Sequence, residues 1–180
     1  MFHFCPSCAS PRIRFEAHKL FRCPDCGFVY YHNIAAATGC IIATDEGILF
    51  LIRAKEPAQG KLDLPGGFVS LEEGAVEGLR RECREEIGWD PGPQVSFFAS
   101  FPNTYPYQGI RYNTCDLFFT CSAPSLRTED LHRDPQEIGG IRFIKPARLL
   151  MEELAFDSTR RVMQAFIGAH PPHEAPLPVV

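Results

Sequence analysis

The chain lacks both a long hydrophobic run and a surplus of positive charge. No apolar stretch in its 180 residues approaches the roughly 18 residues that a transmembrane helix needs. Its 18 lysines and arginines are outnumbered by 22 aspartates and glutamates, and the resulting net charge of −4 argues against nonspecific nucleic-acid binding by the whole chain. The first ten residues, MFHFCPSCAS, lack the basic and apolar segments of a secretory signal. We therefore expect a cytoplasmic protein that makes no contact with a membrane.

Cysteine contributes 8 of the 180 residues, more than folding requires but too small a share for a fold built on disulfides. Reduced thiols are expected in the cytoplasm, where they are available to metals. Half of them form two close pairs near the N-terminus, and these pairs are Cys5-Pro-Ser-Cys8 and Cys23-Pro-Asp-Cys26. Two such pairs allow four thiolates to converge on one tetrahedral Zn²⁺, and four sulfur ligands make that zinc structural. Two disulfides or a redox-active thiol pair are the alternatives.

The segment around these pairs, residues 1–33, is too short to fold on a hydrophobic core alone, so we expect a zinc ribbon. We expect its histidines to be exposed or locally hydrogen-bonded rather than ligands; they are His3, His18 and His32. The ribbon has four basic residues against two acidic ones, interleaved with phenylalanines. Such a combination either stacks bases or packs a small core, and we expect packing. The aromatic positions are Phe2, Phe4, Phe15, Phe21 and Phe28.

The rest of the chain divides into a body over residues 34–170 and a proline-rich tail over 171–180, which we expect to be flexible. In the body, apolar runs around Thr44-Asp45-Glu46-Gly47 predict a β-hairpin. Three- and four-residue spacings predict a helix over 71–87 that stops at Gly88. Strands are expected over 95–101, 112–121 and 140–144, and a last helix from an N-cap at Asp157 or Ser158 to about Ile167. Strands mixed with two helices indicate an α/β or α+β sandwich.

Three carboxylates should crowd one face of the first helix. Glu82, Glu85 and Glu86 lie at i, i+3 and i+4, so their side chains project together and repel one another unless a cation lies between them. Oxygen ligands at this density suit Mg²⁺ or Mn²⁺. The alternative is a solvated stripe of charge that is neutralised by neighbouring arginines, namely Arg80, Arg81 and Arg84.

The pattern around these carboxylates resembles the Nudix box, G-x5-E-x7-R-E-U-x-E-E-x-G-U, in which U is a bulky apolar residue. The chain reads Gly67-x5-Glu73-x7-Arg81-Glu82-Cys83-x-Glu85-Glu86-x-Gly88-Trp89, with Cys83 in the first apolar position as the one soft departure. The resemblance implies an α/β/α sandwich around a mixed sheet. It also implies hydrolysis of a nucleoside diphosphate linked to another group.

The resemblance also implies roles for individual residues. Glu82, Glu85 and Glu86 would be the catalytic and Mg- or Mn-binding carboxylates, with Glu82 and Glu86 as direct ligands and Glu85 as a ligand or water-orienting base. Gly67 would bring a backbone carbonyl to the metal. A structural ion pair would join Glu73 to Arg81.

A zinc ribbon followed by a Nudix domain is similar to the NADH pyrophosphatase branch of the superfamily. That branch has a further signature, S-Q-P-W-P-F-P-x-S, after the box. Here the corresponding stretch reads Ala99-Ser-Phe-Pro-Asn-Thr-Tyr-Pro-Tyr107, which keeps the proline spacing but lacks the Gln-Pro-Trp core. NADH, ADP-ribose, another dinucleotide or a capped nucleotide all fit as substrates.

Residues outside the box are candidates for substrate contact. Arg53 and Lys55 could meet phosphates, and Glu137 could supply a further catalytic carboxylate. An aromatic wall for a nucleobase or nicotinamide ring could come from Phe101, Tyr105, Tyr107 and Tyr112. For each ring taken alone, core or edge packing is the simpler expectation.

Two functions from different classes therefore stay open. The first is a metal-dependent Nudix pyrophosphohydrolase, whose expected partner is a nucleotide-linked small molecule. The second is a regulatory module that senses a nucleotide in a Nudix-like pocket and uses the ribbon to contact nucleic acid or protein. For the enzyme, no nucleic-acid partner is expected other than a capped RNA, and a homodimer is a family-based expectation.

Overall fold

The computed structural model describes residues 2–170, and the chain forms two compact units, Met1–Ile34 and Ala35–Val180. Each unit is described by itself. The proline-rich tail that we expect over 171–180 lies outside the described residues. None of the helices in the described part is long and apolar enough to cross a membrane.

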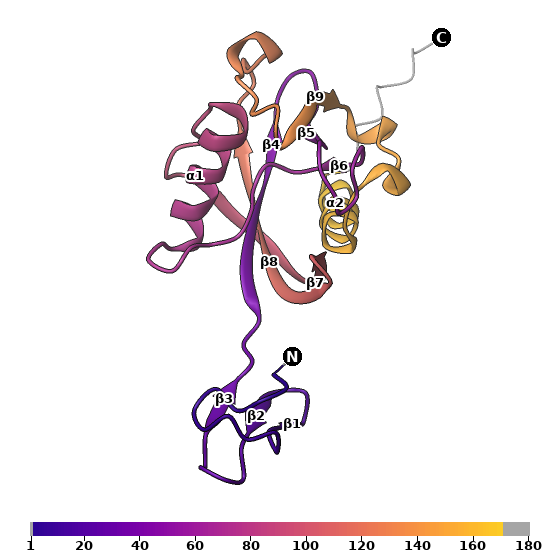
Figure 1. The fold of residues 1–180 in the computed structure, drawn as a ribbon. Coiled ribbons are helices and arrows are strands. Elements are labelled where there is room, and N and C mark those ends of the chain that lie inside the picture. Colours follow the sequence, from indigo (N-terminus) through magenta and orange to yellow (C-terminus); the bar gives the residue numbers. More distant parts are fainter. Residues whose placement is uncertain (1, 171–180) are drawn as a thin grey trace, which may run out of the picture. The chain divides into compact units, whose positions relative to one another are not determined.

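The first unit is a small antiparallel sheet with two cysteine-bearing turns (Figure 1). Its strands are β1 (Arg14–Glu16), β2 (Leu20–Arg22) and β3 (Val29–Tyr31), in the order β1-β2-β3. Phe21 at the centre of β2 is buried, and its ring centroid lies 4.6 Å from that of Phe15. Part of the aromatic content of the ribbon therefore packs a small core, as expected.

The second unit is built on a mixed sheet of six strands. The order is β6-β5-β4-β8-β7, with β9 paired to β5, and β4 and β8 run parallel whereas the other pairs are antiparallel. The strands are β4 (Ala35–Ala43), β5 (Ile48–Arg53), β6 (Leu62–Asp63), β7 (Ser96–Tyr107), β8 (Ile110–Ser122) and β9 (Ile138–Ile144).

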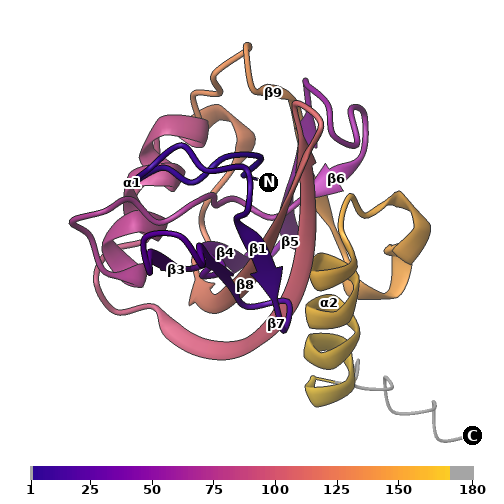
Figure 2. The ribbon, with the colours of Figure 1, turned by 60° about the horizontal axis from the view of Figure 1, so that its bottom comes forward.

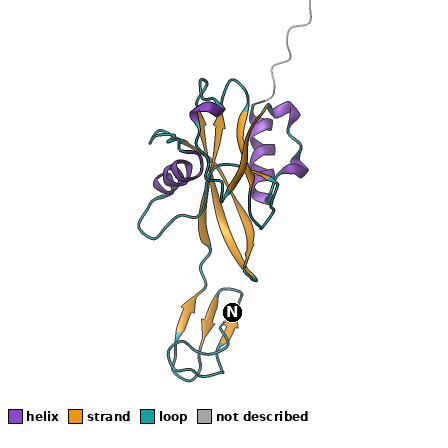
Figure 3. Cartoon of the chain, turned by 45° about the horizontal axis from the view of Figure 1, so that its top comes forward, coloured by secondary structure: helices purple, strands orange, loops and turns teal. Residues whose placement is uncertain are grey.

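Each face of this sheet is covered by one helix, and the strands stand between the two helices (Figure 3). Alternate residues of β4 point to opposite faces, so Cys40 and Ile42 pack with α1 (Ala75–Ile87) whereas Ile41 packs with α2 (Asp157–Ala169). On the second face, β7 runs beside α2 (Figure 2), and Phe98 of β7 meets Phe166 of α2 with ring centroids 5.7 Å apart. This arrangement confirms the α/β/α sandwich around a mixed sheet.

Helix α1 begins later than the sequence predicts. Its N-cap is Gly74, because the carboxylate of Glu73 accepts a hydrogen bond from the backbone N–H of Ser70 at 2.8 Å and so closes a turn before the helix. Its end agrees with the prediction, since Gly88 adopts a left-handed conformation at φ 65° and its N–H bonds to the carbonyl of Arg84. Cys83, the soft departure in the box, is fully buried in the core and serves as an apolar residue there.

Helix α2 corrects the predicted N-cap. The helix runs from Asp157 to Ala169 with Phe156 as its N-cap, and no side chain caps it. Ser158 does not cap the helix because its hydroxyl is buried and donates to the carboxylate of Asp116 at 2.6 Å. Val162 of this helix is fully buried against the sheet.

The predicted strands are present, and two of them are longer than the sequence indicates. β7 and β8 continue past their predicted limits into a tight hairpin that turns at Gln108 and Gly109, both of which have positive φ. The expected hairpin around Thr44–Gly47 joins β4 to β5, with the Thr44 hydroxyl donating to the carbonyl of Gly47 at 2.9 Å.

Candidate metal and substrate sites

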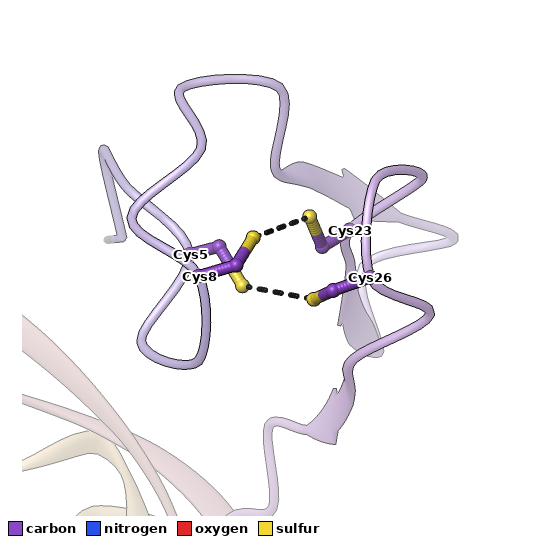
Figure 4. Close-up of side chains that lie close together, drawn as sticks. All are labelled: Cys5, Cys8, Cys23 and Cys26. Atoms are coloured by element: carbon purple, nitrogen blue, oxygen red, sulfur yellow. Dashed lines mark hydrogen bonds between the residues drawn. The ribbon is translucent and has the colours of Figure 1, made fainter.

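The four N-terminal cysteines converge on one point between two turns (Figure 4). Their Sγ atoms all lie within 4.8 Å of one another, and the Cys5–Cys26 and Cys8–Cys23 separations are both 3.7 Å. Four sulfurs around a tetrahedral ion with metal–sulfur bonds of 2.3 Å would lie about 3.8 Å apart. The cysteines are unbonded to one another, so the cluster has the shape of a metal site rather than of two disulfides.

The backbone prepares this arrangement through two similar turns. The N–H of Ala9 bonds to the carbonyl of Cys5 at 2.8 Å, and the N–H of Gly27 bonds to the carbonyl of Cys23 at 3.0 Å. Gly27 has a φ of 75°, which glycine adopts without strain. The ribbon histidines do not join the cluster, and His32 instead lies edge-on to Phe15 and Phe21.

The second unit contains a cavity of about 440 Å³ that is lined by residues of the sheet and of α1. Two of the three crowded carboxylates, Glu82 and Glu86, line it together with the loop residues Gly66 and Gly67. Glu137, Arg53, Tyr105 and Tyr107 line it as well. The structure therefore brings most of the candidate residues to a single cavity.

The cavity carboxylates lie in an environment that disfavours their charge. Burial raises the pKa of Glu86 well above its ordinary value, against the effect of the Gly66 N–H, which donates to its Oε2 at 2.9 Å. Burial also raises the pKa of Glu82, and Arg81 opposes that shift. Glu82 also raises the pKa of Glu86, and Glu137 raises the pKa of both, so a cation between the carboxylates would relieve the repulsion. The donor set thus fits a hard divalent ion.

Arg81 connects the carboxylates of the box. Its guanidinium donates to Glu73 at 2.7 Å, to Glu82 at 2.9 Å and to Glu85 at 2.9 Å, and also to the carbonyl of Phe68 at 3.0 Å. The hydrogen bond from Arg81 lowers the pKa of Glu73 to about 2. The ion pair between Glu73 and Arg81 is thus present in the structure.

Glu85 and Gly67 lie close to the site but are placed differently. The Glu85 side chain is 59% exposed, and its carboxylate contacts Arg81 rather than the cavity wall. The Gly67 carbonyl accepts a hydrogen bond from the N–H of Thr38 at 2.8 Å. A Cβ on Gly67 would lie 2.5 Å from the carboxyl carbon of Glu82, so only glycine leaves room for that side chain.

Glu137 approaches the cavity from a loop before β9. Its carboxylate lies 3.4 Å from the ammonium of Lys55, which also lines the cavity, and both side chains are 57% exposed. A third carboxylate from outside the box therefore shares the cavity with Glu82 and Glu86.

The opposite end of the cavity is aromatic and cationic. Arg53 lies over the ring of Phe156, 4.9 Å from its centroid, and donates to the hydroxyl of Tyr105 at 3.3 Å. It also pairs with Asp63 at 3.3 Å, and burial raises the pKa of that carboxyl. Tyr107 lies next to Tyr105, with ring centroids 6.4 Å apart.

Two of the four expected aromatic residues do not line the cavity. Phe101 packs in the core beside α2, with Arg161 4.7 Å from its ring centroid. Tyr112 lies opposite Tyr105 in the β7–β8 hairpin and contacts Phe68 edge-on. Phe101 and Tyr112 therefore pack against other side chains and do not form part of the cavity wall.

Several cavity residues escape the sequence analysis. Asp116 is buried and accepts hydrogen bonds from Thr114 at 2.5 Å and from Ser158 at 2.6 Å. One signal was available, because Asp116 is the single acidic residue of β8 and directly precedes the apolar run Leu117-Phe118-Phe119. Phe156 and Asp63 carried no such signal, since each reaches the cavity only through the tertiary fold.

Comparison with known proteins gives matches over both sequence and fold. The family model described as NUDIX domain matches residues 33–166, about three quarters of the chain. A NAD-capped RNA hydrolase NudC of Stutzerimonas stutzeri is 31% identical over 104 residues, covering 58% of this chain and 37% of the relative. The NudC of Chromobacterium violaceum is 37% identical over 86 residues, covering 47% of this chain and 32% of the relative. The chain thus matches about a third of the length of these curated relatives.

Solved structures show the same fold. The NUDIX hydrolase of Nitrosomonas europaea superposes with a TM-score of 0.63 at 23% identity, and the match covers 93% of both chains. The MutT NUDIX hydrolase of Burkholderia pseudomallei gives a TM-score of 0.63 at 20% identity, covering 74% of this chain and 98% of that chain. At these identities the likeness concerns the fold alone.

Proposed function

Because this chain belongs to the NUDIX domain family, we propose that it is a metal-dependent hydrolase that cleaves the pyrophosphate bond of a nucleoside diphosphate derivative. One observation carries the proposal. Glu82 and Glu86 of the box line a cavity that also has a cationic and aromatic wall. The cavity is large enough for a nucleotide. Carboxylates that only formed a solvated stripe on α1 would not share a cavity.

Mg²⁺ or Mn²⁺ would be held by Glu82 and Glu86, with Glu85 and the carbonyl of Gly67 as the further ligands that the box implies. When bound, such an ion lowers the pKa of a water molecule and neutralises charge on the departing phosphate. Four thiolates of the ribbon would hold a structural Zn²⁺, since their spacing matches tetrahedral coordination.

The residues of the chain would perform the remaining tasks. Arg81 holds Glu82 in place from one side, so this carboxylate keeps a fixed direction. Glu137 would accept a proton from an attacking water, and the ammonium of Lys55 lies 3.4 Å from its carboxylate. Arg53 would meet a phosphate, and the rings of Tyr105 and Phe156 would stack on a base.

A dinucleotide of the NAD type is the substrate class that we propose. The curated relatives are named NAD-capped RNA hydrolases, and this class includes NADH, ADP-ribose and the NAD cap of an RNA. The stretch from Ala99 to Tyr107 supports the class without selecting a member, because it supplies Tyr105 and Tyr107 to the cavity but has Asn103 where the NADH signature has tryptophan.

The compartment and assembly that we propose follow from the same activity. We place the enzyme in the cytoplasm, where NAD-type nucleotides occur and where thiols stay reduced for zinc. We also propose a homodimer, as the family resemblance implies, and sedimentation of the zinc-loaded chain would measure its mass in solution.

The test is hydrolysis of a substrate panel by the full chain with Mg²⁺ or Mn²⁺. The panel contains NADH, NAD, ADP-ribose, diadenosine polyphosphates and NAD-capped RNA, and we expect turnover of at least one NAD-type member. Binding of these nucleotides without any turnover would instead support the nucleotide-sensing module.

The matched variants are Glu86→Gln and Glu72→Gln, which remove the same charge inside and outside the cavity. We expect Glu86→Gln to remain folded and to lose kcat by about 100-fold or more with little change in KM, because the loss falls on the transition state. Glu72 is exposed, so its variant should keep the wild-type rate. Equal rates for the two variants would show that Glu86 takes no part in catalysis.

A further inference from the structure

The three-stranded sheet of the ribbon has two faces of different character. Phe15, Phe21 and Tyr30 lie opposite one another across the strands and share one face, because side chains alternate along a strand. Phe2 packs on this face, 4.8 Å from Phe21 and 5.6 Å from Tyr30 between ring centroids. Phe21 is buried at the centre of this aromatic face, whereas Phe2 and Tyr30 remain exposed.

The other face, which we call the basic face, has a different composition. One cross-strand row contains Arg14, Arg22 and Val29, and the next row contains Glu16, Leu20 and Tyr31. All residues of β3 are exposed, and Tyr31 retains 52% of its accessible surface. Lys19, in the turn before β2, places its ammonium 5.8 Å from the centroid of the Tyr31 ring.

The positive charge of the basic face is only partly neutralised. Arg14 and Arg22 lie directly opposite each other, a like-charge pairing that destabilises a sheet unless an anion lies nearby. Arg22 pairs with Glu16 at 3.0 Å, but within residues 2–170 no carboxylate lies at ion-pair distance from Arg14 or Lys19. The ribbon has four basic residues against two acidic ones, whereas the rest of the chain has 14 against 20.

We propose that the basic face of the ribbon binds single-stranded nucleic acid, with a base stacked on Tyr31 and phosphates beside Arg14 and Lys19. An exposed ring next to cations is the combination that proteins use for single strands, since the ring takes the base and the cations take the backbone. The proposal goes beyond the hydrolase activity and does not depend on it. The net charge of −4 argues against nonspecific nucleic-acid binding by the whole chain, but that argument does not apply to the ribbon taken by itself.

An acidic protein surface would match the charge of this face but not its exposed ring. A nucleotide strand matches both, because each phosphate is followed by a flat base at short distance. This difference makes Tyr31 the residue that separates the two partners.

The experiment measures fluorescence anisotropy of a labelled uridine oligonucleotide with the full, zinc-loaded chain at salt concentrations from about 50 to 200 mM. We expect binding that weakens with salt, and Arg14→Ala should reduce the slope of log affinity against log salt by about 0.7. Tyr31→Ala should weaken binding by about fivefold or more, whereas Tyr31→Phe, which keeps the ring, should bind like the wild type.

Matched controls distinguish the loss of a nucleic-acid contact from unfolding of the ribbon. Arg12→Ala removes a ribbon arginine that already pairs with Asp25, so it should affect binding less than Arg14→Ala does. The zinc content and the rate of dinucleotide hydrolysis should stay at the wild-type level in every variant. Failure of the hydrolase assay would leave the binding result unaffected.

Three results would overturn the proposal. The first is the absence of binding at low salt, and the second is wild-type affinity in both Arg14→Ala and Tyr31→Ala. The third is equal affinity for a polyglutamate peptide of the same charge, which would identify the partner as an acidic protein surface.

Discussion

Arg81 is the residue through which three acidic side chains of the box are joined. Because it donates to Glu73, Glu82 and Glu85 at once, its position determines both the entry to α1 and the direction of one cavity carboxylate. A lysine has no planar fork and could not make these bonds simultaneously.

The pair of Glu73 with Arg81 predicts a dependence of stability on acid. The folded pKa of Glu73, about 2, lies below its ordinary value of 4.5, so its contribution is present above pH 4.5 and is lost as the pH falls toward 2. We therefore expect the difference in Tm between the wild type and Glu73→Gln to be largest near neutral pH and to vanish toward pH 2. Thermal unfolding measured across this range, with Glu72→Gln as control, checks it. A difference that is constant with pH would contradict the assignment.

The close approach of Gly67 to Glu82 predicts that Gly67→Ala loses activity but keeps its fold. Its φ lies outside the left-handed region, so alanine fits the backbone, but the new Cβ would displace the carboxylate of Glu82. We expect Gly67→Ala to keep a wild-type Tm and to lose about 100-fold in kcat/KM, the scale of a displacement of about 1 Å in an active site. Gly168→Ala, where the new methyl group meets open space, is the control. An unchanged rate in Gly67→Ala would show that Glu82 tolerates the shift.

At the scale of the elements, α1 depends on its C-terminal glycine. Gly88 is left-handed, and a Cβ there would lie 3.1 Å from His132. Alanine should therefore lower the free energy of unfolding by about 1–2 kcal/mol, and asparagine, which tolerates this conformation, should lower it less. Urea unfolding of the two variants measures both values. Equal losses would mean that the contact with His132, and not the backbone angle, dominates.

The elements also show which parts of the fold could be predicted from the sequence. The buried face of α1 follows from the spacing of Leu79, Cys83 and Ile87, because helix periodicity is a local property. Its start does not, since the Glu73 carboxylate joins Ser70 and Arg81 in a turn that no periodicity reveals. Tertiary contacts of this kind override local preference.

The same division applies to the cavity. Its acidic wall is contiguous in the sequence and therefore recognisable as a motif. Asp63, Asp116 and Phe156 come from three separate elements and meet only after the sheet has formed. Spacing along the chain contains no information about such a meeting. The sequence does indicate some lining residues from outside the box, such as Arg53, Tyr105 and Glu137, from their residue types.

At the scale of the whole molecule, two compact units predict two unfolding events. We expect a zinc-selective chelator to unfold the ribbon, which has little core of its own, and to leave the Tm of the second unit within a few degrees of its original value. Calorimetry with and without the chelator, together with release of one zinc per chain, checks this expectation. Loss of both transitions on zinc removal would show that the units do not fold separately.

The parallel pairing of β4 with β8 has a consequence for synthesis of the chain on the ribosome. Its nine residue pairs run from Ala35–Thr114 to Ala43–Ser122, so the central strand waits for a partner that is translated much later. The ribbon precedes β4 entirely, so its four cysteines would be free to bind a metal while the rest is still emerging. During that interval the apolar strand β4 lacks its parallel neighbour, so nascent chains that stall before β8 expose one edge of β4 and should need a chaperone.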